Sequence, residues 1–272
     1  MNRYRLARSY FEIASILILL LLIPAGCAPF KEKSASFPGA GFSGQNTGNL
    51  IENLENANRT LVSCKGLGRM RYVHSGRRRR LRIAWISNVS EKLRVAVLGP
   101  DGRPLLTVSV DGTWFYALDH TTGEFHKDPL DGYRMKMALK LPFDVQSFAL
   151  ILAGRIPVFD YDRIQVADGR KPGETVVILR KWRNRVGKIY IRKAPGAVSG
   201  PAITGIESYR QTGERRYRVT IKEVQRIKAY VVPRSLTVNY GADDSFALDI
   251  DRYWVNEPVS PSTFVLQPPE KG

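Results

Sequence analysis

The heptapeptide RYRVTIK, residues 216–222, shows the pattern that decides the fold. In it Tyr217, Val219 and Ile221 alternate with Arg216, Arg218, Thr220 and Lys222. Successive side chains of a β-strand point to opposite faces of the sheet, so strict alternation predicts a strand with one buried face. The other face is expected to be wet and basic.

Similar short runs occur on both sides of this heptapeptide. They cover residues 80–87, 92–98, 103–110, 113–119, 163–168, 174–181, 187–193, 204–211, 234–240, 245–255 and 263–266. Turn-forming residues such as Asp111-Gly112 separate them, which is typical of an antiparallel meander. A sheet of this size curls toward a barrel. We therefore expect a mainly β (α+β) fold, an incomplete antiparallel β-barrel of about 11 strands.

Two segments have helical spacing instead. Residues 49–61 place Leu50, Ile51 and Leu54 on one face and predict an N-terminal helix that opens the folded domain, 49–272. Residues 133–157 have helical spacing on both sides of Pro142 and end at Gly154, which predicts a helical lid. The residues expected to face the interior, as the walls of an apolar cavity or equally as a dry core, are Trp85, Tyr116, Leu141, Phe143, Phe148 and Leu152.

The N-terminal segment predicts export. Three arginines precede an apolar run at residues 13–23, which has the length of a signal-peptide core and is too short to span a bilayer. Ile23, Pro24, Ala25 and Gly26 then precede Cys27 and resemble the lipobox of bacterial lipoproteins, although Pro24 stands where leucine is usual. The alternative is an ordinary signal peptide followed by a chance cysteine.

The lipobox resemblance implies removal of residues 1–26 and a lipid on Cys27. Ala28 is not the aspartate associated with retention at the inner membrane, which favours the outer membrane. Residues 27–48 are rich in Ser, Gly and other polar residues and show no period, so they are expected to be a flexible tether.

The charge is strongly basic, with 42 Lys and Arg against 25 Asp and Glu, a net charge of +17. An exported basic protein meets anionic lipid headgroups, lipopolysaccharide phosphates or acidic cell-wall polymers rather than nucleic acid. The densest run is Arg77, Arg78, Arg79 and Arg80, directly after a Ser75-Gly76 turn. It either contacts lipid or is a solvated turn that keeps a strand edge from pairing, and the sequence leaves both readings open.

The sequence shows no catalytic constellation. His120 and His126 lie near three acidic residues in one hairpin, a combination that polar turns commonly contain without function. Motifs for nucleophilic hydrolysis, phosphate binding and zinc proteases are missing from the sequence. We therefore expect no enzyme activity, no metal site and no cofactor, and we expect Cys64 to be a small buried hydrophobe.

Several motifs together resemble the LolA–LolB superfamily, in particular LolB-type outer-membrane lipoproteins. A strand with Trp85 precedes a strand that ends in the turn Gly99-Pro100-Asp101-Gly102. A strand pair follows, then the segment LKLPFDVQSFALILAGRIP (139–157) and a closing YWVNEPVSPSTFVLQPP (253–269). The resemblance rests on the order and spacing of these motifs and covers roughly residues 50–268.

The resemblance implies a half-closed barrel whose helical lid covers a cavity for acyl chains. It also implies a lipid-anchored protein on the periplasmic face of the outer membrane, which receives acylated lipoproteins or lipids from a periplasmic carrier at the inner leaflet and acts as a monomer in lipoprotein localisation. Where LolB-type members expose a leucine that assists insertion, the turn Pro100-Asp101-Gly102 has a carboxylate, which is unfavourable in a bilayer. The alternative function is a structural or assembly lipoprotein that uses a filled barrel as a protein-docking scaffold.

Overall fold

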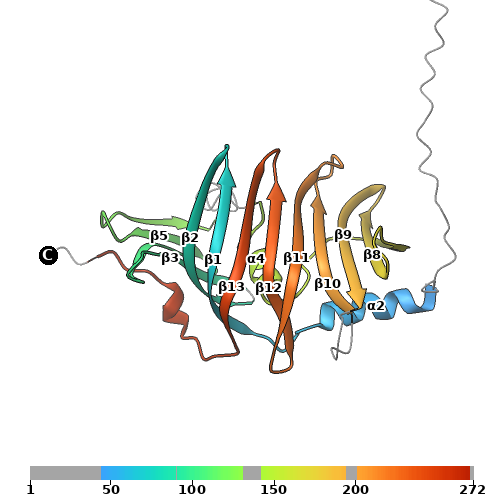
Figure 1. The fold of residues 1–272 in the computed structure, drawn as a ribbon, viewed down its shortest axis with the longest axis horizontal. Coiled ribbons are helices and arrows are strands. Elements are labelled where there is room, and N and C mark those ends of the chain that lie inside the picture. The colour runs from blue at the N-terminus through green and yellow to red at the C-terminus, as the bar shows by residue number, and fades with distance from the viewer. Residues whose placement is uncertain (1–43, 90, 131–141, 194–200, 270–272) are drawn as a thin grey trace, which may run out of the picture. The chain divides into compact units, whose positions relative to one another are not determined.

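The computed structural model describes residues 44–269 except 90, 131–141 and 194–200, all within one compact unit that spans 42–272. In these residues thirteen antiparallel strands form one sheet in the order β6-β5-β4-β3-β2-β1-β13-β12-β11-β10-β9-β8-β7 (Figure 1). The strands are β1 (Ser63–His74), β2 (Arg77–Asn88), β3 (Lys92–Leu98), β4 (Pro104–Val110), β5 (Trp114–Asp119), β6 (Phe125–Pro129), β7 (Arg163–Asp168), β8 (Glu174–Lys181), β9 (Asn184–Lys193), β10 (Pro201–Tyr209), β11 (Arg215–Ile227), β12 (Tyr230–Tyr240) and β13 (Asp244–Val255). The helices are α2 (Gly44–Asn56), α4 (Val145–Leu152) and the 3-10 turn η1 (Pro261–Phe264).

The predicted fold class is confirmed: the chain is mainly β, antiparallel and opened by a helix. The sheet is open rather than closed into a barrel, because β6 and β7 are its two edges. It has thirteen strands instead of about eleven. The alternation of apolar residues did not reveal β1, which contains two glycines, or β6, which is largely polar. Residues 263 and 264, expected to begin the last strand at 263–266, belong to the 3-10 turn η1 instead. Helix α2 begins at Gly44, inside the segment expected to be a tether.

Gly66 explains how the glycine-containing strand β1 fits into the sheet. It pairs with Trp85 of β2, and a Cβ at position 66 would lie 2.0 Å from an atom of the indole ring. The missing side chain therefore makes room for Trp85, which is 2 % exposed. This is a tertiary reason for glycine in a strand, where it is otherwise unfavourable.

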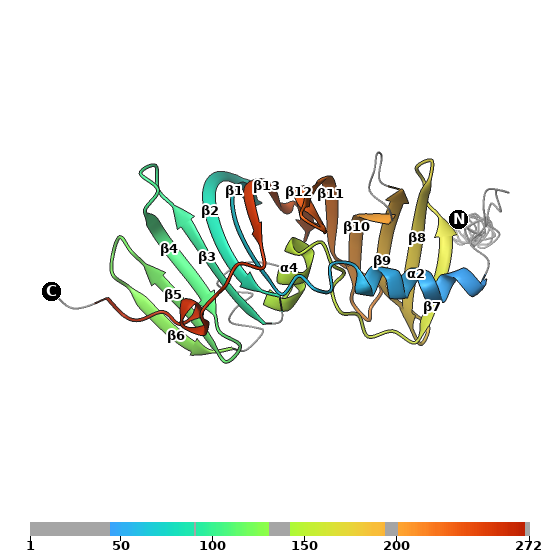
Figure 2. The same cartoon turned by 90° about the horizontal axis from the view of Figure 1, so that it is seen from below.

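One face of the sheet carries the core. Directly paired residues share a face, and the pairs Ile221–Leu236 and Leu236–Leu248 connect β11, β12 and β13. The register continues from Leu248 to Met70 of β1. Both α-helices lie on this inner face (Figure 2). Arg218 and Thr220 face the outer side, as the alternation in 216–222 predicts.

Helix α4 is held against the centre of the inner face. Asp144 caps its N-terminus by accepting a hydrogen bond from the Ser147 backbone N–H at 2.7 Å. At its C-terminus the Tyr253 hydroxyl donates to the Leu152 carbonyl at 2.9 Å. Six of its eight residues are buried, and full burial of one large aliphatic or aromatic side chain contributes roughly 1.5–3 kcal/mol. Neither α-helix in the described part of the chain combines the length and hydropathy needed to cross a bilayer.

Cys64 is buried in the core beside Trp85 and Tyr253, and its thiol is free. Burial raises the pKa of this thiol to about 11. Only the thiolate is nucleophilic, so we expect Cys64 to resist iodoacetamide at neutral pH and to react once the chain is unfolded in urea. Mass spectrometry of the alkylated chain measures this. Rapid labelling of the native protein would contradict the placement of Cys64 in the core.

Candidate functional site

Helix α2 covers the inner face of the β8–β12 half of the sheet (Figure 2). Its apolar side chains Leu50, Ile51 and Leu54 are 1–8 % exposed, whereas Glu52 and Glu55 are exposed. Amphipathic spacing therefore explains why the helix lies on the sheet. It does not fill the space there, because a pocket lies on each side of it.

The larger pocket has a volume of about 600 Å³ and lies between the C-terminal end of α2 and strands β10–β12. Nine of its thirteen lining residues are aliphatic or proline, and Arg226 is the only charged residue among them. The lining residues are Asn53, Leu54, Ala57, Asn58, Gly154, Ala202, Ile203, Ile221, Val224, Arg226, Ala229, Val231 and Pro233. Its size is within the range of small-molecule sites, and its lining suits an apolar chain with an anionic end.

Asn58 joins the three elements around this pocket. Its side-chain amide donates to the Ala153 carbonyl at 2.8 Å and to the Val231 carbonyl at 2.7 Å, and its carbonyl oxygen accepts from the Val231 N–H at 3.3 Å. Gly154 ends α4 with φ +69°, and a Cβ there would lie 2.4 Å from the Val231 carbonyl oxygen. Glycine is thus required for both the backbone angle and the close approach of α4 to β12.

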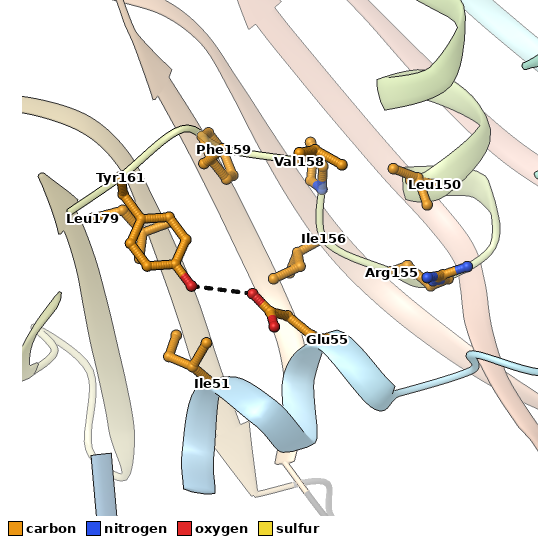
Figure 3. A pocket seen from close by; sticks show the side chains of 10 residues that line it. Ile51, Glu55, Leu150, Arg155, Ile156, Val158, Phe159, Tyr161 and Leu179 are labelled. Atoms are coloured by element: carbon orange, nitrogen blue, oxygen red, sulfur yellow. Dashed lines mark hydrogen bonds between the residues drawn. The ribbon is translucent and has the colours of Figure 1, made fainter. Parts of the chain in front are cut away.

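The smaller pocket, about 150 Å³, lies on the other side of α2 (Figure 3). Ile51 and Glu55 of α2 face the segment after α4, which includes Ile156, Phe159 and Tyr161. The Tyr161 hydroxyl donates to Glu55 Oε1 at 3.1 Å, a contact that connects α2 to this segment. Both pockets therefore share α2 as a wall, and movement of α2 would open both.

Trp85, Phe143, Phe148 and Leu152 lie in the packed core, which is the second of the two readings of the sequence. The ring of Phe143 stacks on Phe148 with centroids 5.3 Å apart and meets Tyr217 and Phe246 edge-on at 5.3 and 6.1 Å. Neither pocket is lined by Trp85, Phe143, Phe148 or Leu152. In the described residues, the rings of Phe143 and Phe148 pack against Tyr217 and Phe246 of the sheet. Leu141 lies outside the described residues.

Tyr116 lies on the opposite face of the sheet from Trp85. The register pairs Trp85 with Val95, whereas Tyr116 pairs with Ser109 and Ser109 with Arg94. Residues 94 and 95 point to opposite faces, so Tyr116 cannot share the interior with Trp85. Its hydroxyl donates to Asp111 Oδ2 at 2.8 Å, and burial raises its pKa to about 12. The residues after β13 cover this outer face, where the Ser109 hydroxyl donates to the Phe264 carbonyl at 2.6 Å.

The arginine run does not form a single face. Arg78 and Arg80 lie on the outer face, whereas Arg77 and Arg79 pair with His74 and Tyr72 on the inner side. All four are exposed. They lie in a part of β2 that pairs with β1 but extends beyond β3, whose register begins at Arg82. The run therefore lies at a free strand edge within the described sheet, as the second reading of the sequence supposes, and its exposure leaves the first reading open.

The turn Pro100-Asp101-Gly102 is a tight, exposed connection between β3 and β4. The Asp101 side chain accepts a hydrogen bond from the Arg103 N–H at 3.1 Å, and its other oxygen lies 3.6 Å from the Arg103 guanidinium. The carboxylate is thus engaged within its own turn. The turn presents no apolar side chain of its own except the proline ring.

The histidines of the β5–β6 hairpin do not converge. His120 Nε2 lies 2.9 Å from the Thr107 hydroxyl, and His126 Nε2 lies 2.8 Å from Glu124 Oε1. In the described parts of the chain, no group of three or more His, Cys, Asp or Glu side chains is placed to hold a metal ion. The lipobox residues 23–26 and Cys27 lie outside the described residues.

Three solved structures are similar to this chain over 81 % of its length. A DUF1329 family protein from Desulfovibrio piger matches with a TM-score of 0.57 at 8 % identity, covering 96 % of that chain. A LolA superfamily protein from Nitrosomonas europaea matches with a TM-score of 0.55 at 11 % identity over 97 % of its chain. A domain from Vibrio parahaemolyticus that is named for outer membrane lipoprotein sorting matches at 0.52, with 8 % identity and 96 % covered.

The fold is LolA-like. Identities of 8–11 % show the fold alone. No family model matches the sequence, and no curated protein matches it closely. In this LolA-like fold, the pocket residues missed by sequence reasoning are those of β10–β12 and of the C-terminal end of α2. The one available signal was the amphipathic spacing of Leu50, Ile51 and Leu54, which marked α2 as a covering helix.

Proposed function

We propose that this chain is a lipoprotein of the bacterial outer membrane that binds acyl chains of lipoprotein or lipid cargo and takes part in lipoprotein localisation. The observation that carries the proposal is the aliphatic pocket of about 600 Å³ beside α2 in a LolA-like fold. Its mechanism is partition: an acyl chain leaves water for an apolar lining, which contributes about 25 cal/mol per Å² of apolar surface buried. No covalent step is involved.

Arg226 gives the pocket a polarity. It is exposed and is the single charged residue of the lining. A guanidinium at the edge of an apolar pocket orients a ligand that has an aliphatic chain and an anionic end, such as a fatty acid carboxylate or a lipid phosphate. The methylene chain would then lie along Leu54, Ile203 and Ile221.

The cellular part of the proposal rests on the N-terminal motif. Removal of residues 1–26 and acylation of Cys27 would anchor the chain at the periplasmic side of the outer membrane, since several acyl chains suffice for stable anchoring. A soluble periplasmic lipoprotein carrier is the proposed donor of cargo. The LolA-like fold and the named role of the Vibrio domain support this setting.

Uptake of a fluorescent fatty acid tests the pocket. The chain from Ala28 onward contains the whole compact unit 42–272 and is expected to bind the probe. Ala57→Trp, which adds an indole to the pocket lining, should lower the affinity at least about tenfold, because it occupies the volume that the probe needs. Glu52→Trp places the same side chain on the solvent side of α2 and should bind like the unchanged chain.

Binding titrations by fluorescence, with thermal unfolding of each variant as a check on folding, measure the difference. Equal affinity of both tryptophan variants for the fatty acid would indicate that it binds outside this pocket. No uptake by the unchanged chain would contradict the carrier function and favour the docking scaffold.

A further inference from the structure

The turn between β8 and β9 exposes a tryptophan. Lys181 pairs with Asn184, so Trp182 and Arg183 form a two-residue turn. Trp182 is 75 % exposed and has φ +57°. This left-handed conformation suits Gly, Asn or Asp and is unusual for a bulky residue. The indole contributes little to the core of the domain and stands at an unfavourable backbone position.

The turn that carries Trp182 is held in place by its neighbours. The Trp182 backbone N–H donates to Asp162 Oδ2 at 2.8 Å, and the Asp162 N–H donates to the Arg180 carbonyl at 2.9 Å. Lys181 forms an ion pair with Asp160. These contacts hold the turn against residues 160–162 just before β7. The indole therefore projects from a turn whose backbone is fixed by its neighbours.

Several other turns lie at the same end of the sheet. Strands joined by hairpins in an antiparallel sheet alternate in direction. The β1–β2, β8–β9, β10–β11 and β12–β13 turns therefore all lie at the same end of the strands, as Figure 1 shows. The β1–β2 and β8–β9 turns are six strand spacings apart, about 29 Å along the sheet at ~4.8 Å per strand. This row of turns is named the turn rim here.

The turn rim is rich in unpaired cations. Arg77, Arg78, Arg79 and Arg183 are exposed, and within the described residues none has an acidic side chain within 4.0 Å. Of the acidic side chains at this end, Glu214 pairs with Arg210, Asp244 with His74 and Asp160 with Lys181, whereas Asp243 in the β12–β13 turn is exposed. The rim therefore combines one protruding indole with a row of guanidinium groups.

We propose that the turn rim is a contact site for an anionic phospholipid bilayer, in which Trp182 enters the interface and the arginines bind headgroup phosphates. Tryptophan favours the membrane–water interface because its ring is apolar and its N–H is polar. Lys and Arg near an anionic surface add electrostatic attraction. Three of these arginines are consecutive on β2 and the fourth, Arg183, is next to Trp182, so exposed cations lie at both the β1–β2 and the β8–β9 turn.

Contact by the turn rim needs no ligand in the pocket, and none of the rim residues named above lines it. The bilayer contact is assigned to Trp182 and the arginines rather than to the Pro100-Asp101-Gly102 turn, where Asp101 makes insertion unfavourable.

Vesicle co-sedimentation tests the proposal with the chain from Ala28 onward, which lacks Cys27 and therefore any lipid. We expect it to bind vesicles of phosphatidylglycerol and phosphatidylcholine, and to bind weakly to phosphatidylcholine alone or at high salt. Trp182→Ser should lower partition about tenfold. Trp182→Gly, which suits the left-handed backbone, should show the same loss without a lower melting temperature.

Trp254→Ser is the matched control. Trp254 is 38 % exposed and pairs with Lys65 at the opposite end of β1 and β13, so its replacement should leave partition unchanged. Equal loss in both serine variants, or no binding of the unchanged chain to anionic vesicles, would overturn the proposal. If the chain bound a soluble polyanion but not anionic vesicles, the proposal would also be overturned. The arginines would then be assigned to binding of the polyanion. Fatty acid uptake by Trp182→Ser should be normal, which separates this result from a failure of the pocket.

Discussion

Replacement of Phe143 by alanine is expected to lower the free energy of unfolding by about 3–5 kcal/mol. Phe143 is 1 % exposed and touches three other aromatic rings, Phe148 of α4 and Tyr217 and Phe246 of the sheet. Removing its ring leaves a cavity where α4 meets the sheet, and the loss combines the transfer free energy of the ring with the cost of that cavity. Urea denaturation followed by circular dichroism measures the change.

Val158→Ala provides the comparison. Val158 is 76 % exposed in the segment after α4, and its truncation should change the free energy of unfolding by less than about 0.5 kcal/mol. If Phe143→Ala were equally mild, the aromatic cluster would not be the centre of the core. The space under α4 would then be a soft region able to admit a ligand, as the sequence interpretation allowed.

Gly154→Ala is the second large effect, expected at about 2–5 kcal/mol. A left-handed backbone angle costs an L-residue about 1–2 kcal/mol, and overpacking adds roughly 1–3 kcal/mol. Both apply here, because φ is +69° and the new Cβ would lie 2.4 Å from the Val231 carbonyl oxygen and 2.8 Å from the Asn58 amide nitrogen. Relief of these contacts must separate α4 from β12 or displace Asn58, so fatty acid binding should weaken as well.

Gly213→Ala separates the two contributions. Gly213 has φ +84° in the β10–β11 turn, and a Cβ there would meet nothing within 4 Å. It should show the conformational cost of about 1–2 kcal/mol alone, with unchanged fatty acid affinity. Parallel urea titrations and probe titrations give both quantities. Equal losses for the two glycines would mean that the close packing around Asn58 does not hold the pocket wall.

Local periodicity predicted much of the fold. The alternation in 216–222 placed Tyr217, Val219 and Ile221 on the inner face, and all three are buried. The spacing of Leu50, Ile51 and Leu54 predicted α2, and Gly154 was expected to end α4, as it does. These predictions succeeded because each depends on residues close together in the chain, whose side-chain directions follow from backbone geometry alone.

The errors concern contacts between distant residues. Strand β1 was not predicted because glycines such as Gly66 interrupt its apolar pattern. The reason for glycine at this position is the indole of Trp85 in the next strand, which occupies the space that a Cβ would need. Tyr116 was grouped with Trp85, although the register across β3 and β4 places them on opposite faces. A shift of one residue in such a register reverses the face of every side chain, and apolar character alone does not reveal it.

By itself, the sequence determined that the fold is rich in β-strands and that the strands alternate between an apolar and a basic face. It also determined the amphipathic helix at the start of the domain. The tertiary structure decided which part of the inner face is filled and which is hollow. In the described residues, the rings of Phe143, Phe148, Tyr217 and Phe246 pack against one another beside α4, whereas small and aliphatic side chains leave a pocket beside α2. The physical reason is that a void remains wherever the side chains that meet between two packed elements have less volume than the space between those elements. No single stretch of sequence contains that difference.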